Sequence, residues 1–283
     1  MKNVLITAGA SGIGKRIAEK FFDKGYNIWV CDIDETALGE VPQSWRTSLA
    51  DVSVEAEVKA LFDMIAGEWG SIDTVCCNAG IAGPTGPIEG VSLIDWQKCL
   101  SVNLEGSFLT SKYAVPLMKK VSAGSILFTS STAGIYGYPN RSPYSAAKWA
   151  VVGFMKTLAM ELGPFGIRSN AVCPGSVEGP RMELVMAREA KLKGITRDQV
   201  YKAYASSNSM RSFIQEDDIA NMMVFLASED AKFVSGQVIS VDGHTENPDP
   251  KINTNLGLTI KSIDNKKSSL DKETQLQKKK ALD

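Results

Sequence analysis

Short apolar runs alternate with helix-like segments along most of the chain, and this alternation constrains the fold more than any other feature. We expect strands at Val4–Thr7, Ile28–Cys31, Thr74–Cys77, Ser125–Thr129, Arg168–Val172 and Val238–Val241. We expect helices at Lys15–Lys24, Val54–Trp69, Leu93–Phe108, Leu109–Lys120 (interrupted near Pro116), Tyr144–Leu162 and Glu216–Ala227. Apolar strands between helices predict an α/β fold whose parallel sheet is covered on both faces.

Two segments depart from this alternation. Residues 176–212 form a long excursion with helical patterns at Met182–Leu192 and Arg197–Ala205. Because ligands bind at the carboxyl ends of strands in such folds, we expect a substrate loop or lid there. Residues 247–283 contain no aromatic residue and are rich in lysine, which predicts a flexible polar tail after a single domain at 1–246.

Charge and cysteine content exclude several classes of protein. The formal net charge of −1 implies no general affinity for nucleic acid or for anionic membranes. Five cysteines without a C-x-x-C pair, together with the single histidine His244, argue against a disulfide framework, a metal site and a mechanism that needs two histidines. No apolar stretch reaches the ~20 residues of a membrane span. We therefore expect a cytoplasmic protein that acts on a small molecule.

The glycine-rich segment Thr7–Gly14 joins the first expected strand to the first expected helix. Glycines permit a tight turn through which backbone N–H groups approach a pyrophosphate, and the start of a helix adds a partial positive charge. A turn that binds nothing is the alternative, but the position between strand and helix favours a dinucleotide. The residues expected at this site are Gly9, Ser11, Gly12, Ile13 and Gly14.

Asp32 ends the second expected strand. A carboxylate there accepts hydrogen bonds from the adenosine ribose hydroxyls and repels a 2′-phosphate. Neither Ile33 nor Ser11 supplies a positive charge for such a phosphate. The sequence therefore predicts NAD in preference to NADP, and a solvated turn residue is the alternative interpretation of Asp32.

Tyr144 and Lys148 are four residues apart on an expected helix, so their side chains share one face. This spacing is weak evidence alone, but its context makes it specific. Ser131 comes just after the strand at 125–129, and Asn103 lies on another expected helix. Two further segments follow strands, namely Asn78-Ala79-Gly80 and Pro174-Gly175.

With this set of residues in this order, the chain resembles the short-chain dehydrogenase/reductase family over residues 2–246. The resemblance implies a doubly wound Rossmann fold with seven parallel strands, a nicotinamide cofactor and a homotetramer. It implies that Tyr144 is the general acid/base and that Ser131 holds the substrate oxygen. Lys148 would bind the nicotinamide ribose and lower the pKa of Tyr144, and Asn103 would hold a proton-relay water.

The resemblance also implies further cofactor contacts. Asp51 and Val52 would flank the adenine, and the segment from Asn78 through Ala79 to Gly80 would contact the adenosine ribose. The remaining expected cofactor contacts are Tyr144, Lys148, Pro174, Gly175 and Val177.

The implied roles agree with the chemistry of alcohol oxidation, which removes a hydride and a proton. A free tyrosine has a pKa near ~10, so it needs neighbouring positive charge to act as a base. A neutral serine hydroxyl orients the substrate oxygen without competing for the proton.

Four positions depart from the family pattern. Ala8 replaces the usual first glycine of the turn, Cys77 replaces an asparagine, and Gly179 stands where a threonine often contacts the nicotinamide carboxamide. His244 replaces a glycine after the last strand. We expect His244 at a subunit contact, with a place in the substrate pocket as the alternative.

The sequence is less informative about the substrate. Beside Ser131 and Tyr144, the expected substrate contacts are Tyr138, Arg141, Arg181 and Met182. The two arginines suit a carboxylate, phosphate or sulfonate, although solvated arginines and an apolar lid fit the same segment.

We predict an NAD(H)-dependent oxidoreductase that interconverts a secondary alcohol and a ketone. Two alternatives remain: a reductase of 3-oxoacyl groups on an acyl carrier protein, which would usually use NADPH, and a non-catalytic protein that senses the dinucleotide.

Overall fold

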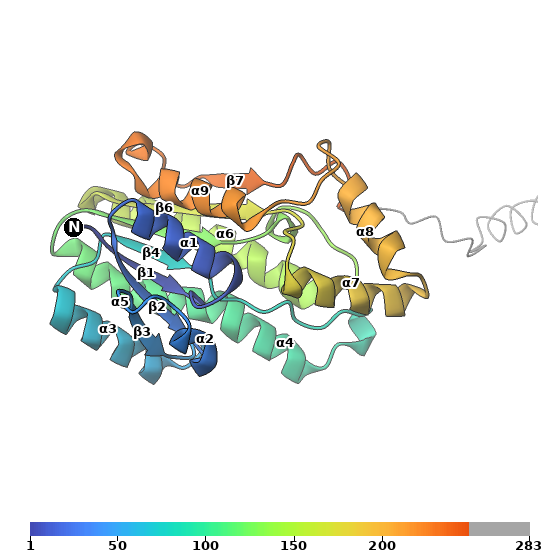
Figure 1. The fold of residues 1–283 in the computed structure, drawn as a ribbon, viewed down its shortest axis with the longest axis horizontal. Helices are drawn as coiled ribbons and strands as arrows, with labels where there is room; N and C mark the ends of the chain where they lie inside the picture. The colour runs from blue at the N-terminus through green and yellow to red at the C-terminus, as the bar shows by residue number, and fades with distance from the viewer. Residues whose placement is uncertain (249–283) are drawn as a thin grey trace, which may run out of the picture. The chain divides into compact units, whose positions relative to one another are not determined.

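A parallel seven-stranded sheet organises residues 1–248, the part of the chain that this computed structural model describes (Figure 1). Its strands lie in the order β3-β2-β1-β4-β5-β6-β7. They are β1 (Asn3–Thr7), β2 (Asn27–Asp32), β3 (Arg46–Leu49), β4 (Thr74–Cys77), β5 (Gly124–Thr129), β6 (Ile167–Pro174) and β7 (Val238–Val241). The expected α/β fold with a doubly wound sheet is confirmed.

Nine α-helices connect the strands of this region. They are α1 (Gly12–Asp23), α2 (Glu35–Gly39), α3 (Glu55–Trp69), α4 (Leu93–Leu100), α5 (Gly106–Lys119), α6 (Ser142–Leu162), α7 (Pro180–Lys193), α8 (Arg197–Ser206) and α9 (Glu216–Ala227). The two helices expected in the 176–212 excursion are present as α7 and α8. Both lie beyond the carboxyl ends of the strands (Figure 1).

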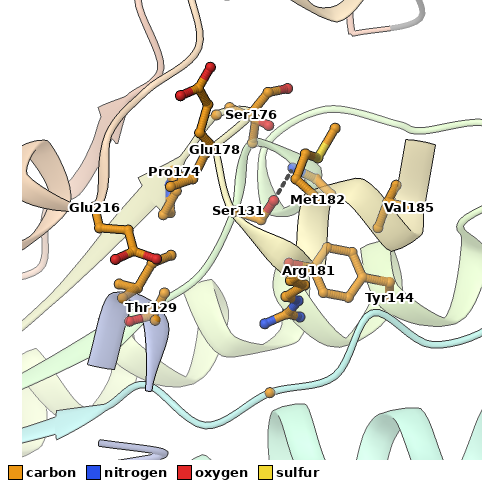
Figure 2. A pocket seen from close by; sticks show the side chains of 18 of the residues that line it. Thr129, Ser131, Tyr144, Pro174, Ser176, Glu178, Arg181, Met182, Val185 and Glu216 are labelled. Carbon is orange, nitrogen blue, oxygen red and sulfur yellow. Dashed lines mark hydrogen bonds between the residues drawn. The ribbon is translucent and has the colours of Figure 1, made fainter. Parts of the chain in front are cut away.

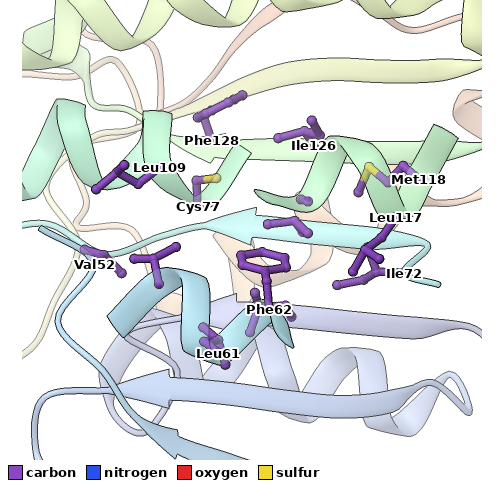
Figure 3. Packing of buried hydrophobic residues seen from close by; sticks show 14 of the residues in the cluster. Val52, Leu61, Phe62, Ile72, Cys77, Leu109, Leu117, Met118, Ile126 and Phe128 are labelled. Atoms are coloured by element: carbon purple, nitrogen blue, oxygen red, sulfur yellow. The ribbon is translucent and has the colours of Figure 1, made fainter. Parts of the chain in front are cut away.

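Each face of the sheet has its own apolar core, because successive side chains of a strand point to opposite faces. On one face, Leu5 and Phe128 pack with Phe62 of α3 and with residues of α5 and α6 (Figure 3). On the other face, Ile6 packs with Phe21 of α1 and with residues of α9. Both faces are therefore covered, as expected for strands made of continuous apolar runs.

The apolar pattern alone predicted six strands and missed β3. This strand has the sequence Arg-Thr-Ser-Leu, and only its serine is buried. It forms the edge of the sheet and pairs with β2. An edge strand needs no continuous apolar run, so hydrophobic pattern carries little signal for it.

The predicted boundary between helices at 108 and 109 is wrong. The break is a π-helical turn at Ser101–Glu105, and α5 then continues through Pro116. Buried neighbours of this proline, Leu117 and Met118, anchor the helix in the core, which compensates for the hydrogen bond that a proline cannot make.

No helix among residues 1–248 is long and apolar enough to cross a membrane. The predicted tail, 247–283, lies outside the described residues from position 249 onward.

Candidate active site

A cavity of about 630 Å³ opens at the carboxyl ends of the strands (Figure 2). Segments far apart in the sequence form its wall: the β1–α1 turn, the ends of β4, β5 and β6, and the first turns of α6 and α7. The expected site residues that line it are Ser11, Gly12, Ile13, Gly14, Asn78, Gly80, Ser131, Tyr138, Arg141, Tyr144, Lys148, Pro174, Gly175, Val177, Arg181 and Met182.

The glycine turn fits a phosphate group. A Cβ on Gly14 would lie 1.9 Å from the Ala8 carbonyl oxygen, so no side chain can replace the hydrogen there. Gly12 has φ +53°, and Ala8 also adopts a positive φ of 50°, which costs an alanine conformational energy. Ser11 caps α1 without a side-chain hydrogen bond, so the first N–H groups of the helix are available to an anion.

Asp32 lies at the end of β2, beside this turn but outside the cavity wall. One carboxylate oxygen accepts a hydrogen bond from the Ala10 N–H at 3.2 Å, and the other accepts from the Ile33 N–H at 2.8 Å. Ile33 is 69% exposed and brings no charge. The carboxylate is therefore fixed where an adenosine ribose would approach the turn.

The other expected cofactor residues lie behind or beside the cavity. The Gly9 N–H donates to the Cys31 carbonyl, and the Ala79 N–H donates to the Thr7 hydroxyl. Asp51 and Val52 follow β3, and neither lines the cavity.

The Asn78 side chain follows β4 and forms hydrogen bonds to the ends of β1 and β5. Its amide donates to the Thr7 carbonyl and accepts from the Thr129 hydroxyl, at 3.2 and 3.0 Å. This explains why an asparagine suits the end of β4: one side chain supplies both a donor and an acceptor to its neighbours in the sheet.

Asn103 is fully buried in the π-helical turn. Its amide nitrogen donates to the carbonyls of Ile81 and Cys99, at 3.0 and 2.8 Å. The amide oxygen is buried without a partner, and a Cβ on Gly80 would lie 2.5 Å from it. A buried acceptor of this kind needs a donor, for which a water is the natural candidate.

Three side chains meet on the catalytic side of the cavity. Ser131 follows β5, and its hydroxyl accepts from the Ala133 N–H at 3.1 Å. Tyr144 and Lys148 project from the first two turns of α6. The Lys148 ammonium lies 5.7 Å from the Tyr144 ring centre and donates to the Thr129 carbonyl at 2.8 Å. The structure thus brings Ser131 to the tyrosine and lysine that the sequence had placed on one face of another element.

The balance of charge favours the tyrosinate. Burial raises the pKa of Tyr144, but the positive charges of Lys148, Arg181 and Arg141 and a hydrogen bond to Ser131 outweigh it, so the pKa lies below that of a free tyrosine. Burial also lowers the pKa of Lys148. A buried phenol whose pKa is lowered by neighbouring charge is a candidate acid/base group.

The cavity residues that were not predicted include Glu178, Tyr204 and Glu216. The Glu216 carboxylate lies 3.6 Å from where a Cβ of Gly12 would stand, and burial raises its pKa. It begins α9, which packs against α1, and only this tertiary contact brings it to the turn. The spacing of Val200 and Tyr204 on one face of an expected helix was a signal that could have identified Tyr204.

His244 lies outside the cavity wall within this chain. Its φ of 64° explains why a glycine suits the position. The Nδ1 atom lies 2.6 Å from the Ser209 hydroxyl. A pocket role within one subunit is therefore not supported.

The chain is similar to known proteins over most of its length. A family model described as enoyl-(acyl carrier protein) reductase matches residues 7–244. An uncharacterized oxidoreductase of Thermotoga maritima is 36% identical over 249 residues, which cover 86% of this chain and 96% of the relative. A D-beta-hydroxybutyrate dehydrogenase of Rhizobium meliloti is 33% identical and covers 86% and 97% of the two chains. The crystal structure of an NAD⁺-bound xylitol dehydrogenase, 28% identical, superposes with a TM-score of 0.83 over 86% of this chain and 98% of that one.

The chain belongs to the short-chain dehydrogenase/reductase family. It is an oxidoreductase that acts on CH–OH donors and the corresponding carbonyls, with a nicotinamide dinucleotide of the NAD(P) type.

Proposed function

We propose that this protein interconverts a secondary alcohol and a ketone with NAD(H), and that Tyr144 is the acid/base. One observation carries the proposal: the Tyr144 hydroxyl, the Lys148 ammonium and the Ser131 hydroxyl line the same cavity as the glycine turn. A proton-transfer group and a phosphate-binding turn in one cavity are what dehydrogenation requires.

The roles follow from the contacts. Ser131 orients the substrate oxygen toward Tyr144, which takes the proton in oxidation and returns it in reduction. Lys148 lowers the pKa of Tyr144 and is held in place by the Thr129 carbonyl. The unpaired oxygen of Asn103 holds a water on the route by which the proton leaves. A bound nicotinamide supplies the hydride acceptor or donor.

The dinucleotide would be held by residues of the cavity wall and by residues that lie beside it. The turn from Gly9 to Gly14 takes the pyrophosphate, and Asp32 takes the adenosine ribose, with Asp51, Val52 and the Asn78–Gly80 segment around the adenosine. Tyr144, Lys148, Pro174, Gly175 and Val177 surround the nicotinamide end.

Asp32 supports NAD in preference to NADP, since its carboxylate faces the turn and Ile33 offers no cation for a 2′-phosphate. The similar xylitol dehydrogenase was crystallised with NAD⁺. The description of the matching family model favours a second candidate, reduction of acyl groups on a carrier protein. That reaction would usually use NADPH, so cofactor choice separates the two.

We further propose a cytoplasmic homotetramer with one dinucleotide domain at 1–246. Its support is the exposed apolar surface of α5 and α6, where Phe108 and Trp149 are 46% and 50% exposed.

Measuring catalytic turnover tests this proposal. The purified full-length protein is assayed with NADH and a panel of ketones, and with NAD⁺ and the matching secondary alcohols, by the change in nicotinamide absorbance. The proposal expects reduction of at least one ketone and loss of that activity in Tyr144→Phe. Binding of NADH without turnover of any ketone or alcohol would instead support the dinucleotide-sensing alternative.

A further inference from the structure

We propose that Arg141 and Arg181 form an anion subsite beside Tyr144, so that the natural substrate is a hydroxy acid or oxo acid whose carboxylate, or an equivalent oxyanion, lies near the reacting carbon. The inference rests on the proposed function and names the substrate class of the same site. Arg141 precedes α6 and Arg181 is the second residue of α7, so the two arginines reach the cavity from different elements.

Both arginines lie close to the reacting group. The Arg141 guanidinium carbon is 4.8 Å from the centre of the Tyr144 ring. Arg181 lines the same cavity as Tyr144. Their charges are among the causes that lower the pKa of Tyr144. A substrate oxygen that contacts Tyr144 and Ser131 therefore places its neighbouring carbons within reach of both guanidinium groups.

The Arg141 guanidinium is held in place and keeps one donor without a partner. Its Nη2 donates to the Ala82 carbonyl at 3.1 Å, which fixes the guanidinium plane. Its Nε is buried and has no hydrogen-bond partner. A buried N–H group without a partner needs an acceptor, and a carboxylate oxygen of a bound substrate would supply one.

The charges around the cavity also favour an anion. Within residues 1–248, no salt bridge joins Arg141 or Arg181 to a carboxylate. Of the two acidic cavity residues, Glu178 accepts hydrogen bonds from Tyr201 and Gln215, and Glu216 lies at the glycine turn. Both arginines also stand at the N-termini of helices of 21 and 14 residues, whose positive ends add to the field. Two unneutralised cations beside the tyrosine select an anionic substrate over a neutral one.

The experiment compares matched substrates. A 2-oxo acid and a 3-oxo acid are each assayed beside their methyl esters with NADH, and the panel includes an oxo phosphonate and an oxo sulfonate to identify the preferred oxyanion. We expect kcat/KM for the better acid to exceed that for its ester at least 100-fold. Arg141→Gln and Arg181→Gln should each reduce this acid-to-ester ratio at least tenfold, mainly through KM for the acid. Arg188→Gln, on α7 but outside the cavity wall, should leave the ratio unchanged.

Three results would overturn the inference. The first is an acid-to-ester ratio near one in the wild-type protein. The second is an unchanged ratio in both cavity variants. The third is an Arg181→Gln variant that binds NADH at least tenfold more weakly while its acid-to-ester ratio is unchanged. That result would assign Arg181 to the dinucleotide. In all three cases, reduction of neutral ketones would still support the proposed function. If NADH binds but no ketone is reduced, the proposed function and this inference both fail.

Discussion

At the scale of single residues, the proposed chemistry depends on the hydroxyl of Tyr144. Tyr144→Phe removes the proton donor and keeps the ring under Arg141. We expect kcat/KM to fall about 10³-fold, within the range for a general acid–base group, while the dissociation constant of NADH changes less than a few-fold. Steady-state kinetics and NADH fluorescence measure the two effects. Tyr136→Phe is the control, because Tyr136 lies outside the cavity wall. Equal loss of activity in both variants would contradict the role.

The pH dependence tests the electrostatics of the same residue. Oxidation requires the deprotonated tyrosine, so kcat/KM for the alcohol should rise with pH and reach a plateau at an apparent pKa below that of a free tyrosine. Lys148→Met removes the largest of the charges that lower this pKa, so the profile should move to higher pH. A profile that does not move in the variant would show that Lys148 does not control the proton.

Sequence could propose catalytic residues because their types and spacing are specific, and helical spacing alone placed Tyr144 and Lys148 on one face. It could not identify Glu216, since only the packing of α9 against α1 brings this side chain to the glycine turn. The unpaired oxygen of Asn103 likewise required the structure, because the π-helical turn that orients it has no pattern in the sequence.

At the scale of elements, the proposed cofactor site depends on the conformation of the β1–α1 turn. In Gly14→Ala the new Cβ would meet the Ala8 carbonyl oxygen at 1.9 Å, and this backbone atom cannot rotate away. We expect the turn to open and NADH affinity to fall at least 100-fold, which corresponds to roughly 2.7 kcal/mol. Isothermal titration measures the change.

Gly67→Ala is the matched control. Nothing lies within 4 Å of a Cβ at Gly67, near the end of α3. Alanine should stabilise the helix by about 0.5–1 kcal/mol and leave NADH binding unchanged. If Gly14→Ala binds NADH as well as Gly67→Ala does, the turn is not the phosphate site.

The elements themselves followed from sequence wherever an apolar run was continuous, as in β4 and β5. The polar edge strand β3 could not be predicted in this way, because its pairing with β2 needs no buried face. The break between α4 and α5 was also misplaced, since it is a π-helical turn and the backbone on both sides of it stays helical.

At the scale of the whole molecule, the exposed apolar surface of α5 and α6 predicts self-association. Trp149→Glu places a charge on this surface, so the proposed tetramer should dissociate to smaller species in size-exclusion chromatography with light scattering. Met64→Glu is the control, since Met64 is equally exposed on α3, at 49%. A monomeric wild-type protein, or dissociation in both variants, would contradict this interface.

The central claim, that this is an NAD enzyme of alcohol oxidation, is tested most directly by fluorescence titration of the full-length protein with NADH and with NADPH. The fixed carboxylate of Asp32 predicts that NADH binds at least 100-fold more tightly than NADPH, and that Asp32→Ala narrows the difference. Equal or tighter binding of NADPH would contradict the account and would make reduction of acyl groups on a carrier protein the leading interpretation.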